Sequence, residues 1–316
     1  MYEPSDNVQV NARSPAEQPV SPLVTVVIPT YNRMPLLLEA IHSVVAQNYT
    51  NWELFIADDG STDGTIEAVR VMNDPRVRII ELSHTGNIGS LRNTGAQAGK
   101  GEWIAFLDSD DRWLPDKLQI QLNSLTASSR RWGYGAYELM GEFAGPIENR
   151  SRKFYPYCGW ITKEIITAEA AVSIGTLTIE RKLFNEAGGF STNEKLIYRE
   201  DYDLALRLSL KAEADAVPEV LVHIREHRGR STNHVRDSFE RMAETYTQFI
   251  KIKPGPTLEK IARKRRGYHL AEAAANNLSQ KKYLLAGRQL GKALADGDRM
   301  KHVLSVLKRS VNRVSS

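Results

Sequence analysis

Acidic side chains concentrate in the run DSDD, directly after the apolar segment GEWIAFL. Asp108 and Asp110 lie two positions apart, so in an extended chain their side chains point to the same side. Carboxylate oxygens are the ligands that hard cations such as Mg²⁺ and Mn²⁺ prefer. Asp111 follows, either as a supporting partner of these acids or as a cap of the next helix. The pattern predicts a divalent-metal site, with a solvated acidic turn as the alternative.

A second acidic segment, DDGSTDGT, follows the apolar run WELFIA. Asp59 stands at the predicted tip of this strand, where it would face a ligand. Residues 61–64 are typical of a turn and a helix N-cap, and we interpret them structurally. Arg92 lies in a predicted helix facing the same side, where a guanidinium could pair with a phosphate or a base edge. An isolated helical arginine on the surface is the alternative.

Apolar runs and helical patterns alternate through the first third of the chain. Strands are predicted by LVTVVIPTY, WELFIADD, VRIIEL and GEWIAFL. Helices are predicted between them by MPLLLEAIHSVVAQN, TIEAVRVMN and GSLRNTGAQAG. This alternation is typical of a doubly wound α/β fold with a mostly parallel sheet, in which ligands bind beyond the carboxyl ends of the strands. The chemistry-bearing residues fall at those ends: Thr30, Tyr31, Asp58, Asp59 and the DSDD run.

The rest of the chain is less regular. Helices are predicted over PDKLQIQLNSL and EDYDLALRLSLKAEA, a strand and a short helix over IGTLTIERKLFNEAGGF, and a strand over EVLVHIREH. Residues 128–161 are aromatic-rich and irregular. Beyond residue 233 we expect three helices, the last two forming a helical hairpin, with many basic side chains. We therefore expect a disordered polar leader over 1–22, an α/β domain over 23–232 and a helical, basic extension over 233–316.

Bulk composition excludes several classes of protein. The chain has 316 residues, of which 41% are hydrophobic and 25% charged, as expected for a globular protein with a sizeable core. A formal net charge of +4 suits anionic ligands or lipid surfaces but is too weak to indicate nucleic-acid binding. The single cysteine, Cys158, excludes an intrachain disulfide. We find neither a signal peptide nor a membrane-spanning run, so we expect a cytoplasmic protein.

Five motifs, in order along the chain, resemble glycosyltransferase family 2, whose fold is GT-A. They are VTVVIPTYNR, SVVAQNYTNWELFIADDGSTDGT, NIGSLRNTGAQAGKGEWIAFLDSDDRW, EAGGF and REDYDLALRL. The resemblance covers residues 23–232. It implies an inverting transfer of a sugar from a nucleotide-diphosphate donor, with a UDP-sugar expected, and a divalent metal, Mn²⁺ or Mg²⁺. The acceptor would be a saccharide or a lipid-linked molecule in cell-surface polysaccharide or glycolipid synthesis.

The resemblance also implies roles for single residues on the donor side. The donor would be bound by Thr30, Tyr31, Arg33, Asp59, Arg92 and Asp108, with Thr30 and Asp59 at the nucleobase. The metal would be bound by Asp110. His227, in the segment VHIREHRGRST, is a candidate ligand of metal or diphosphate. Gly175 and Thr176 are possible acceptor contacts or supporting residues, and we expect the chain near them, together with the 128–161 stretch, to set specificity.

The catalytic base implied by the family is Asp201, in an ED motif that opens a predicted helix. A carboxylate at a helix N-terminus is held by backbone N–H groups and can accept a proton from a hydroxyl group within reach. Glu200 would orient Asp201 or contact the acceptor. The alternative is that both acids only complement the helix dipole.

Two other functions remain as alternatives. A nucleotidyltransferase normally carries a glycine-rich phosphate loop after its first strand, which VVIPTYNR lacks. A degenerate transferase domain that only binds is opposed by the intact acids. The basic C-terminal helices would sit peripherally on anionic lipid at the inner face of the membrane, or else form a solvated face or a contact in an oligomer.

Overall fold

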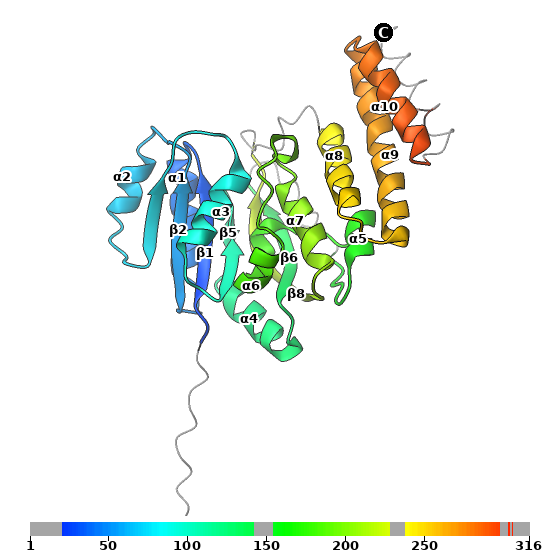
Figure 1. The fold of residues 1–316 in the computed structure, drawn as a ribbon. Coiled ribbons are helices and arrows are strands. Elements are labelled where there is room, and N and C mark those ends of the chain that lie inside the picture. Colours follow the sequence, from blue (N-terminus) through cyan, green and yellow to red (C-terminus); the bar gives the residue numbers. More distant parts are fainter. Residues whose placement is uncertain (1–20, 142–153, 228–237, 298–302, 304, 306–316) are drawn as a thin grey trace, which may run out of the picture.

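The computed structural model describes residues 21–141, 154–227, 238–297, 303 and 305. Residues outside these ranges include nearly all of the predicted leader, Arg228 in the segment VHIREHRGRST, and the end of the C-terminal extension. Among the described residues, an eight-stranded sheet has the order β3-β2-β1-β4-β7-β6-β8-β5 (Figure 1). Its strands are β1 (Val24–Thr30), β2 (Trp52–Asp58), β3 (Val77–Glu81), β4 (Trp103–Phe106), β5 (Arg112–Trp113), β6 (Trp132–Met140), β7 (Thr178–Glu180) and β8 (Ala214–Arg225).

The sheet is mostly parallel, as the sequence predicts. Strands β3, β2, β1 and β4 run parallel, and β6 runs parallel to β8. Strand β7 is antiparallel to both β4 and β6, and the short edge strand β5 is antiparallel to β8. The carboxyl ends of β1, β4 and β8 therefore lie at one edge of the sheet, which is where a ligand is expected.

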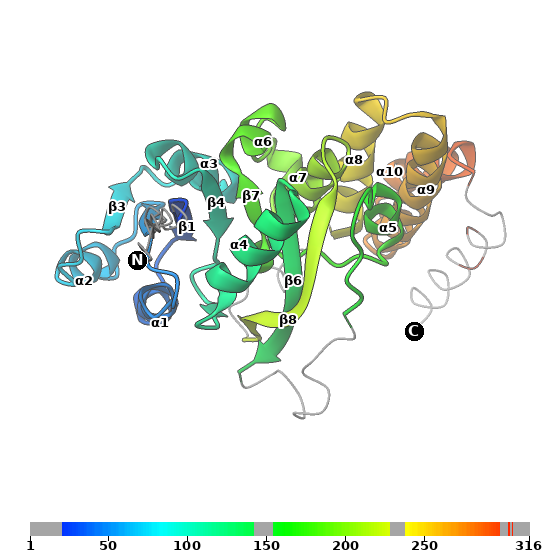
Figure 2. The same cartoon turned by 90° about the horizontal axis from the view of Figure 1, so that it is seen from below.

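Helices cover both faces of the sheet (Figure 2). One face packs on α1 (Met34–Val45), α2 (Thr65–Arg70) and α4 (Lys117–Ser128). The other packs on α3 (Ile88–Ala98), α5 (Thr162–Thr167), α6 (Arg181–Glu186) and α7 (Glu200–Ser209). The alternation of side chains along β1 divides them between the two cores, with Val26 on the first face and Val27 on the second.

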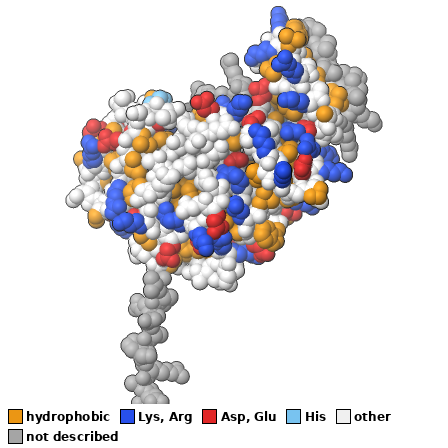
Figure 3. All heavy atoms as spheres, in the orientation of Figure 1, with side chains coloured by type: hydrophobic (Ala, Val, Ile, Leu, Met, Phe, Trp, Pro, Cys, Tyr) orange, Lys and Arg blue, Asp and Glu red, His pale blue; other side chains and the backbone are white. Residues whose placement is uncertain are grey.

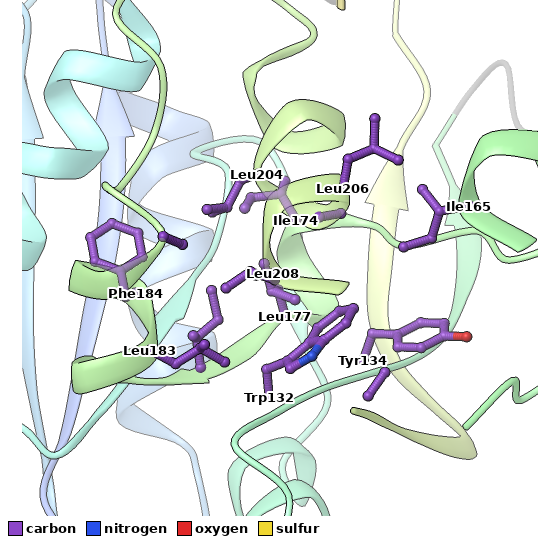
Figure 4. Close-up of a cluster of buried hydrophobic side chains, with 14 of the residues drawn as sticks. Trp132, Tyr134, Ile165, Ile174, Leu177, Leu183, Phe184, Leu204, Leu206 and Leu208 are labelled. Carbon is purple, nitrogen blue, oxygen red and sulfur yellow. The ribbon is translucent and has the colours of Figure 1, made fainter. Parts of the chain in front are cut away.

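The second core contains the largest buried side chains and anchors α7. Trp132 and Tyr134 of β6 are fully buried, and Leu204 and Leu208, one turn apart on α7, pack in the same cluster (Figure 4). Burying a leucine side chain contributes roughly 1.5–3 kcal/mol. The apolar stripe predicted for this helix is thus confirmed, and it fixes the orientation of the helix that begins at Glu200.

The predicted strand over 219–227 is wrong in its start, because β8 begins at Ala214. The strand contains Pro218. The register with β6 passes from Val217 directly to Val220, so Pro218 and Glu219 fall in a bulge. A proline is tolerated at such a point because no ladder hydrogen bond is required of it. The two-residue strand β5 and the helix α5 were also not predicted.

Helices α8 (Ser238–Lys251), α9 (Pro256–Ser279) and α10 (Tyr283–Ala295) follow. Helices α9 and α10 lie side by side, which confirms the predicted helical hairpin (Figure 1). Helix α8 packs on α7, and α9 contacts α5. None of the described helices combines the length and the apolar character needed to cross a membrane.

Candidate active site

A cleft lies at the carboxyl ends of β1, β4 and β8. Its lining brings together residues that are far apart in the sequence. Seven of them are charged: Arg33, Arg92, Asp108, Asp110, Asp111, Glu200 and Asp201. The acids of the DSDD run and those of the ED motif, predicted separately, therefore face the same space.

The three aspartates of the DSDD run form a compact cluster just after β4. Each offers a carboxylate oxygen, and these oxygens lie within 4.8 Å of one another. The Asp111 N–H donates to the Asp108 carbonyl over 3.1 Å, which curls the run into a turn. Asp111 Oδ1 in turn accepts a 2.8 Å hydrogen bond from the backbone N–H of Arg225 on β8.

Asp110 is the meeting point of two predicted donor-side residues. Its Oδ2 pairs with Arg33 Nη1 and lies 3.0 Å from His227 Nε2. Arg225 Nε donates to the carbonyl of the same aspartate over 2.9 Å, while its Nη2 reaches Glu39 over 2.5 Å. The structure thus brings His227, a candidate from the family resemblance, next to the acid cluster.

Arg92 joins the two acidic motifs. Its Nη2 donates to Asp108 Oδ1 over 2.6 Å, and its Nη1 donates to Glu200 Oε1 over 2.6 Å. The residue is only 2% exposed, and its guanidinium faces the ring of Phe190 at 5.3 Å. Burial opposes the charge, but Asp108, Glu200 and Asp201 outweigh it and raise the pKa of Arg92 further. It is a fixed positive charge and not a surface residue.

Glu200 and Asp201 open α7 and line the same cleft. Asp201 Oδ1 accepts a 2.7 Å hydrogen bond from the backbone N–H of Tyr202. Burial raises the pKa of Asp201, and the positive charge of Arg92 opposes the rise. Burial likewise raises the pKa of Glu200, against Arg92 and with the help of the Asp201 charge. A carboxylate whose pKa is moved toward neutrality is a better proton acceptor in the range where enzymes work.

Other predicted donor residues lie at the tips of β1 and β2. Asp59 is 2% exposed, and its carboxylate accepts from the backbone N–H groups of Thr85 over 2.9 Å and Gly86 over 2.8 Å. Thr30 is buried, and its hydroxyl has no hydrogen-bond partner in the part of the chain that the structure describes. Tyr31 is half exposed and stacks on His84, with ring centroids 4.1 Å apart. These residues lie beside the charged cleft and do not line it.

The turn over 61–64 has the structural role that we predicted. Asp63 accepts from the N–H groups of Thr65 over 3.2 Å and Met34 over 3.0 Å. Gly64 has φ of 88°, a conformation that glycine adopts without strain. This turn therefore ties α1 to the start of α2.

Gly175 and Thr176 are buried and face away from the cleft. The Gly175 carbonyl accepts from Trp113 Nε1 over 2.8 Å, and the Thr176 carbonyl accepts from Gln121 Nε2 over 2.7 Å. Their neighbours Ser173 and Ile174 line the cleft instead. Gly175 and Thr176 thus lie directly behind lining residues, and their role toward the acceptor stays a prediction.

Sequence reasoning also missed two residues near the acids. Tyr198 lines the cleft with φ of +66°, an uncommon conformation for a bulky side chain, and no sequence signal announces it. His84 reaches the Asp59 carboxylate at 2.9 Å. It lies in a loop after β3, where a histidine between polar residues has no pattern to distinguish it.

Comparison with known proteins places the chain in a family. The model of glycosyl transferase family 2 matches residues 25–131. A β-1,3-glucosyltransferase of Escherichia coli, WfgD, is 32% identical over 194 residues, which span 59% of this chain and 69% of WfgD. This chain belongs to glycosyltransferase family 2. The resemblance drawn from five motifs is therefore confirmed.

Two further similarities extend the comparison for this family 2 glycosyltransferase. TuaG of Bacillus subtilis, a putative teichuronic acid biosynthesis glycosyltransferase, is 35% identical over 129 residues, which span 40% of this chain and about half (51%) of TuaG. A solved structure of S. aureus TarS in complex with UDP-GlcNAc superposes with a TM-score of 0.68 at 17% identity. It covers 93% of this chain and 89% of that one. The similarity to the TarS structure supports the GT-A fold.

The residues at the cleft fit the divalent metal that this family implies. Five carboxylates and two arginines line it, so the described wall carries an excess of negative charge. The three aspartates supply oxygen donors, which Mn²⁺ and Mg²⁺ prefer over nitrogen or sulfur. His227 Nε2 lies beside this cluster, 3.0 Å from Asp110 Oδ2.

Proposed function

We propose that this glycosyltransferase transfers a sugar from a UDP-sugar to a hydroxyl group of a saccharide or lipid-linked acceptor, with inversion and with a divalent metal. One observation carries the proposal. Arg92 bridges Asp108 and Glu200, so the acids of the DSDD run and the ED pair at the start of α7 line one cleft. A donor group and a proton acceptor can therefore be held close to one another.

The donor side is assigned to the tips of β1, β2 and β4. Asp110 would hold the metal with Asp108 and Asp111, and His227 is a further ligand. When bound, Mn²⁺ or Mg²⁺ neutralises the charge that develops on the departing diphosphate. Arg33 and Arg92 supply fixed positive charge near the same phosphates. Thr30, Tyr31 and Asp59 would hold the nucleobase and ribose, which requires the Asp59 contacts to the 84–86 loop to open.

The acceptor side is assigned to α7. Asp201 takes the proton from the acceptor hydroxyl as that oxygen forms a bond to the anomeric carbon. The bond from this carbon to the diphosphate oxygen breaks at the same time, and UDP leaves. A single displacement of this kind inverts the anomeric configuration. Glu200, held by Arg92, orients the turn that carries Asp201.

Relatives indicate the kind of pathway. The name of WfgD specifies a GlcNAc-diphosphoundecaprenol acceptor and UDP-glucose, TuaG is assigned to teichuronic acid biosynthesis, and TarS was solved with UDP-GlcNAc. We therefore propose a UDP-hexose or UDP-N-acetylhexosamine as donor and a role in the synthesis of a cell-surface polysaccharide or glycolipid.

A lipid-linked acceptor would be presented at a membrane, and the C-terminal hairpin offers a surface for it. Tyr283, Leu284 and Leu285 are exposed at the start of α10, beside Lys281 and Lys282. Figure 3 shows blue and orange side chains intermixed over this region. Apolar side chains flanked by lysines are suited to the surface of an anionic bilayer. Flotation with anionic and with neutral liposomes tests this, and Leu284→Glu should reduce binding to the anionic vesicles.

A donor panel tests the function directly. The protein is incubated with UDP-, GDP- and dTDP-sugars with Mn²⁺, with Mg²⁺ and with chelator, and nucleotide release is measured. Metal-dependent release of UDP from one or two UDP-sugars supports the proposal. Binding of donors without turnover, in the presence and absence of candidate acceptors, would favour a binding module. Release of pyrophosphate from a nucleoside triphosphate and a sugar phosphate would favour a nucleotidyltransferase.

A further inference from the structure

Helix α8 holds the turn that carries Asp201 on both sides. On one side, Arg199 Nη2 donates a 2.6 Å hydrogen bond to Oγ of Ser238, the first residue of α8. On the other, the hydroxyl groups of Tyr202 and Tyr246 lie 3.0 Å apart, with Tyr246 about two turns further along α8. Because Asp201 lies between Arg199 and Tyr202 in the sequence, these contacts bracket the proposed base.

The tyrosine pair forms a junction of four helices. Tyr202 Oη donates to the Ile165 carbonyl of α5 over 2.7 Å, and Tyr246 Oη donates to the next carbonyl, Ile166, over 3.1 Å. The two rings meet edge to face at 6.1 Å, and His269 of α9 stacks on Tyr246 at 5.7 Å. Tyr246 is fully buried, so its position is fixed by packing on all sides.

This junction bears directly on the carboxylate of the proposed base. The N–H of Tyr202 is the group that donates to Asp201 Oδ1, over 2.7 Å. The side chain of Tyr202 fixes where its own backbone lies. A small shift of Tyr202 would therefore move the hydrogen bond that orients Asp201.

The arginine contact acts through charge. Burial raises the pKa of Asp201, and the positive charges of Arg92 and Arg199 oppose that rise. Ser238 holds the guanidinium of Arg199 in place. Tyr198, the residue before Arg199, has φ of +66°. Such a backbone conformation persists only where the surrounding structure determines it. The segment that leads into α7 is thus kept in a strained conformation next to α8.

We infer that Ser238 and Tyr246 are positioning residues for the transfer reaction, and that α8 is part of the apparatus that holds Asp201 in its reactive orientation. The inference rests on the proposed function, because it takes Asp201 to be the base. It gives the C-terminal helices a role in the reaction itself, beyond any contact with a membrane.

The test uses Ser238→Ala in the full chain. Release of UDP from UDP-glucose and from UDP-GlcNAc is measured with Mn²⁺ as a function of pH. We expect kcat to fall roughly tenfold, as a misplaced catalytic group produces, while the donor KM stays unchanged. The acid limb of the kcat profile should move to higher pH, because a released Arg199 no longer opposes the effect of burial on the pKa of Asp201. Ser238→Thr keeps the hydroxyl group and should restore both values.

Two further variants complete the design. Tyr246→Phe removes one hydroxyl group and keeps the ring, and we expect a lower kcat with an unmoved acid limb. Thr245→Val is the matched control on the same helix, because the Thr245 hydroxyl donates only to the Arg241 carbonyl within α8, over 3.0 Å. It should leave kcat and its pH profile as in the wild type.

The outcomes separate the two proposals. An active wild type with a Ser238→Ala variant of unchanged kcat and unchanged acid limb would overturn the positioning role and leave the proposed function intact. A loss of kcat without a shift of the limb, and without rescue by threonine, would also overturn it, since general destabilisation explains that result. A wild-type protein that releases UDP from neither donor would count against the proposed function instead.

Discussion

Arg92 and Glu200 are joined by a 2.6 Å hydrogen bond across 108 positions of the sequence. Both side chains are almost entirely buried, at 3% and 5% exposure. The pair ties α3, which follows the third strand, to the start of α7, where the proposed base lies. Burial of two charges costs desolvation, and removing one partner of such a pair leaves the other charge buried and unpaired.

Breaking this pair should therefore cost both stability and turnover. For Arg92→Met we expect the free energy of unfolding to fall by about 3–5 kcal/mol, because Glu200 is left as a buried, unpaired charge. Denaturant unfolding measures this. The double variant Arg92→Met/Glu200→Gln removes both charges and should recover most of the stability without recovering UDP release. Recovery of activity in the double variant would contradict a role for the pair in the reaction.

Removing the metal or its proposed anchor should weaken donor binding. We expect Asp110→Ala to bind UDP-sugar with the same affinity in Mn²⁺ and in EDTA, whereas the wild type should lose affinity in EDTA. The carboxylate of Asp110 is the point where Arg33 and His227 converge, so its loss removes the centre of the cluster. Calorimetry in both buffers gives the answer. If the wild-type protein binds the UDP-sugar with the same affinity in Mn²⁺ and in EDTA, the proposed role of the metal is wrong.

The dependence of turnover on pH follows from the environment of Asp201. Burial raises the pKa of this carboxyl group, with Arg92 opposing. A base accepts a proton only when it is ionised, so kcat should rise with pH as Asp201 loses its proton. The midpoint of this acid limb should lie above about 3.9, the ordinary value for aspartate. The acid limb is measured in a pH series of kcat for UDP release. If its midpoint lies at or below that value, the group that titrates is not Asp201 in this buried environment.

Lys117 offers a test of the fold away from the cleft. Its Nζ donates to Thr178 Oγ1 over 2.9 Å and lies 4.1 Å from the Trp113 ring, and burial lowers its pKa well below the usual value. The unfolded chain then binds one more proton between that lowered pKa and about 10.4. Stability should rise with pH across this window.

Replacing Lys117 by methionine should abolish that rise and raise the free energy of unfolding at pH 7, because methionine has no charge to lose on burial. Denaturant unfolding of both proteins at pH 7 and pH 9 measures the slope. Thr178 keeps its 2.7 Å hydrogen bond to Gln121 in the variant, so no buried hydroxyl is orphaned. Parallel slopes for wild type and variant would show that Lys117 is charged in the folded protein.

Local sequence patterns predicted the parts of the site that depend on single strands. The acids after WELFIA and GEWIAFL lie at strand ends because a doubly wound sheet places them there, and the amphipathic pattern after Glu200 predicted α7. His227 was a candidate because the resemblance to the family implies a histidine in the segment VHIREHRGRST. Each of these depends on neighbours in the sequence.

The contacts missed by the sequence join distant segments. No local sequence pattern indicates that Arg92 reaches Glu200, or that Ser238 holds Arg199. Nor does any local pattern indicate that the 84–86 loop donates hydrogen bonds to the Asp59 carboxylate. The sequence likewise gives no indication of where the carbonyl groups of Gly175 and Thr176 point. A short 3₁₀ turn at 174–176 points their carbonyl groups to Trp113 and Gln121, and only the packed structure supplies those partners.

The central claim is that Asp201 is the base of a sugar transfer, and Asp201→Asn tests it most directly. The substitution keeps the size of the side chain and removes its ability to take a proton. Turnover of the UDP-sugar and its binding are measured on the same preparation with Mn²⁺. We predict that kcat falls by a factor of at least about 100 while the donor Kd stays as in the wild type. Wild-type turnover, or loss of donor binding together with turnover, would contradict the assignment.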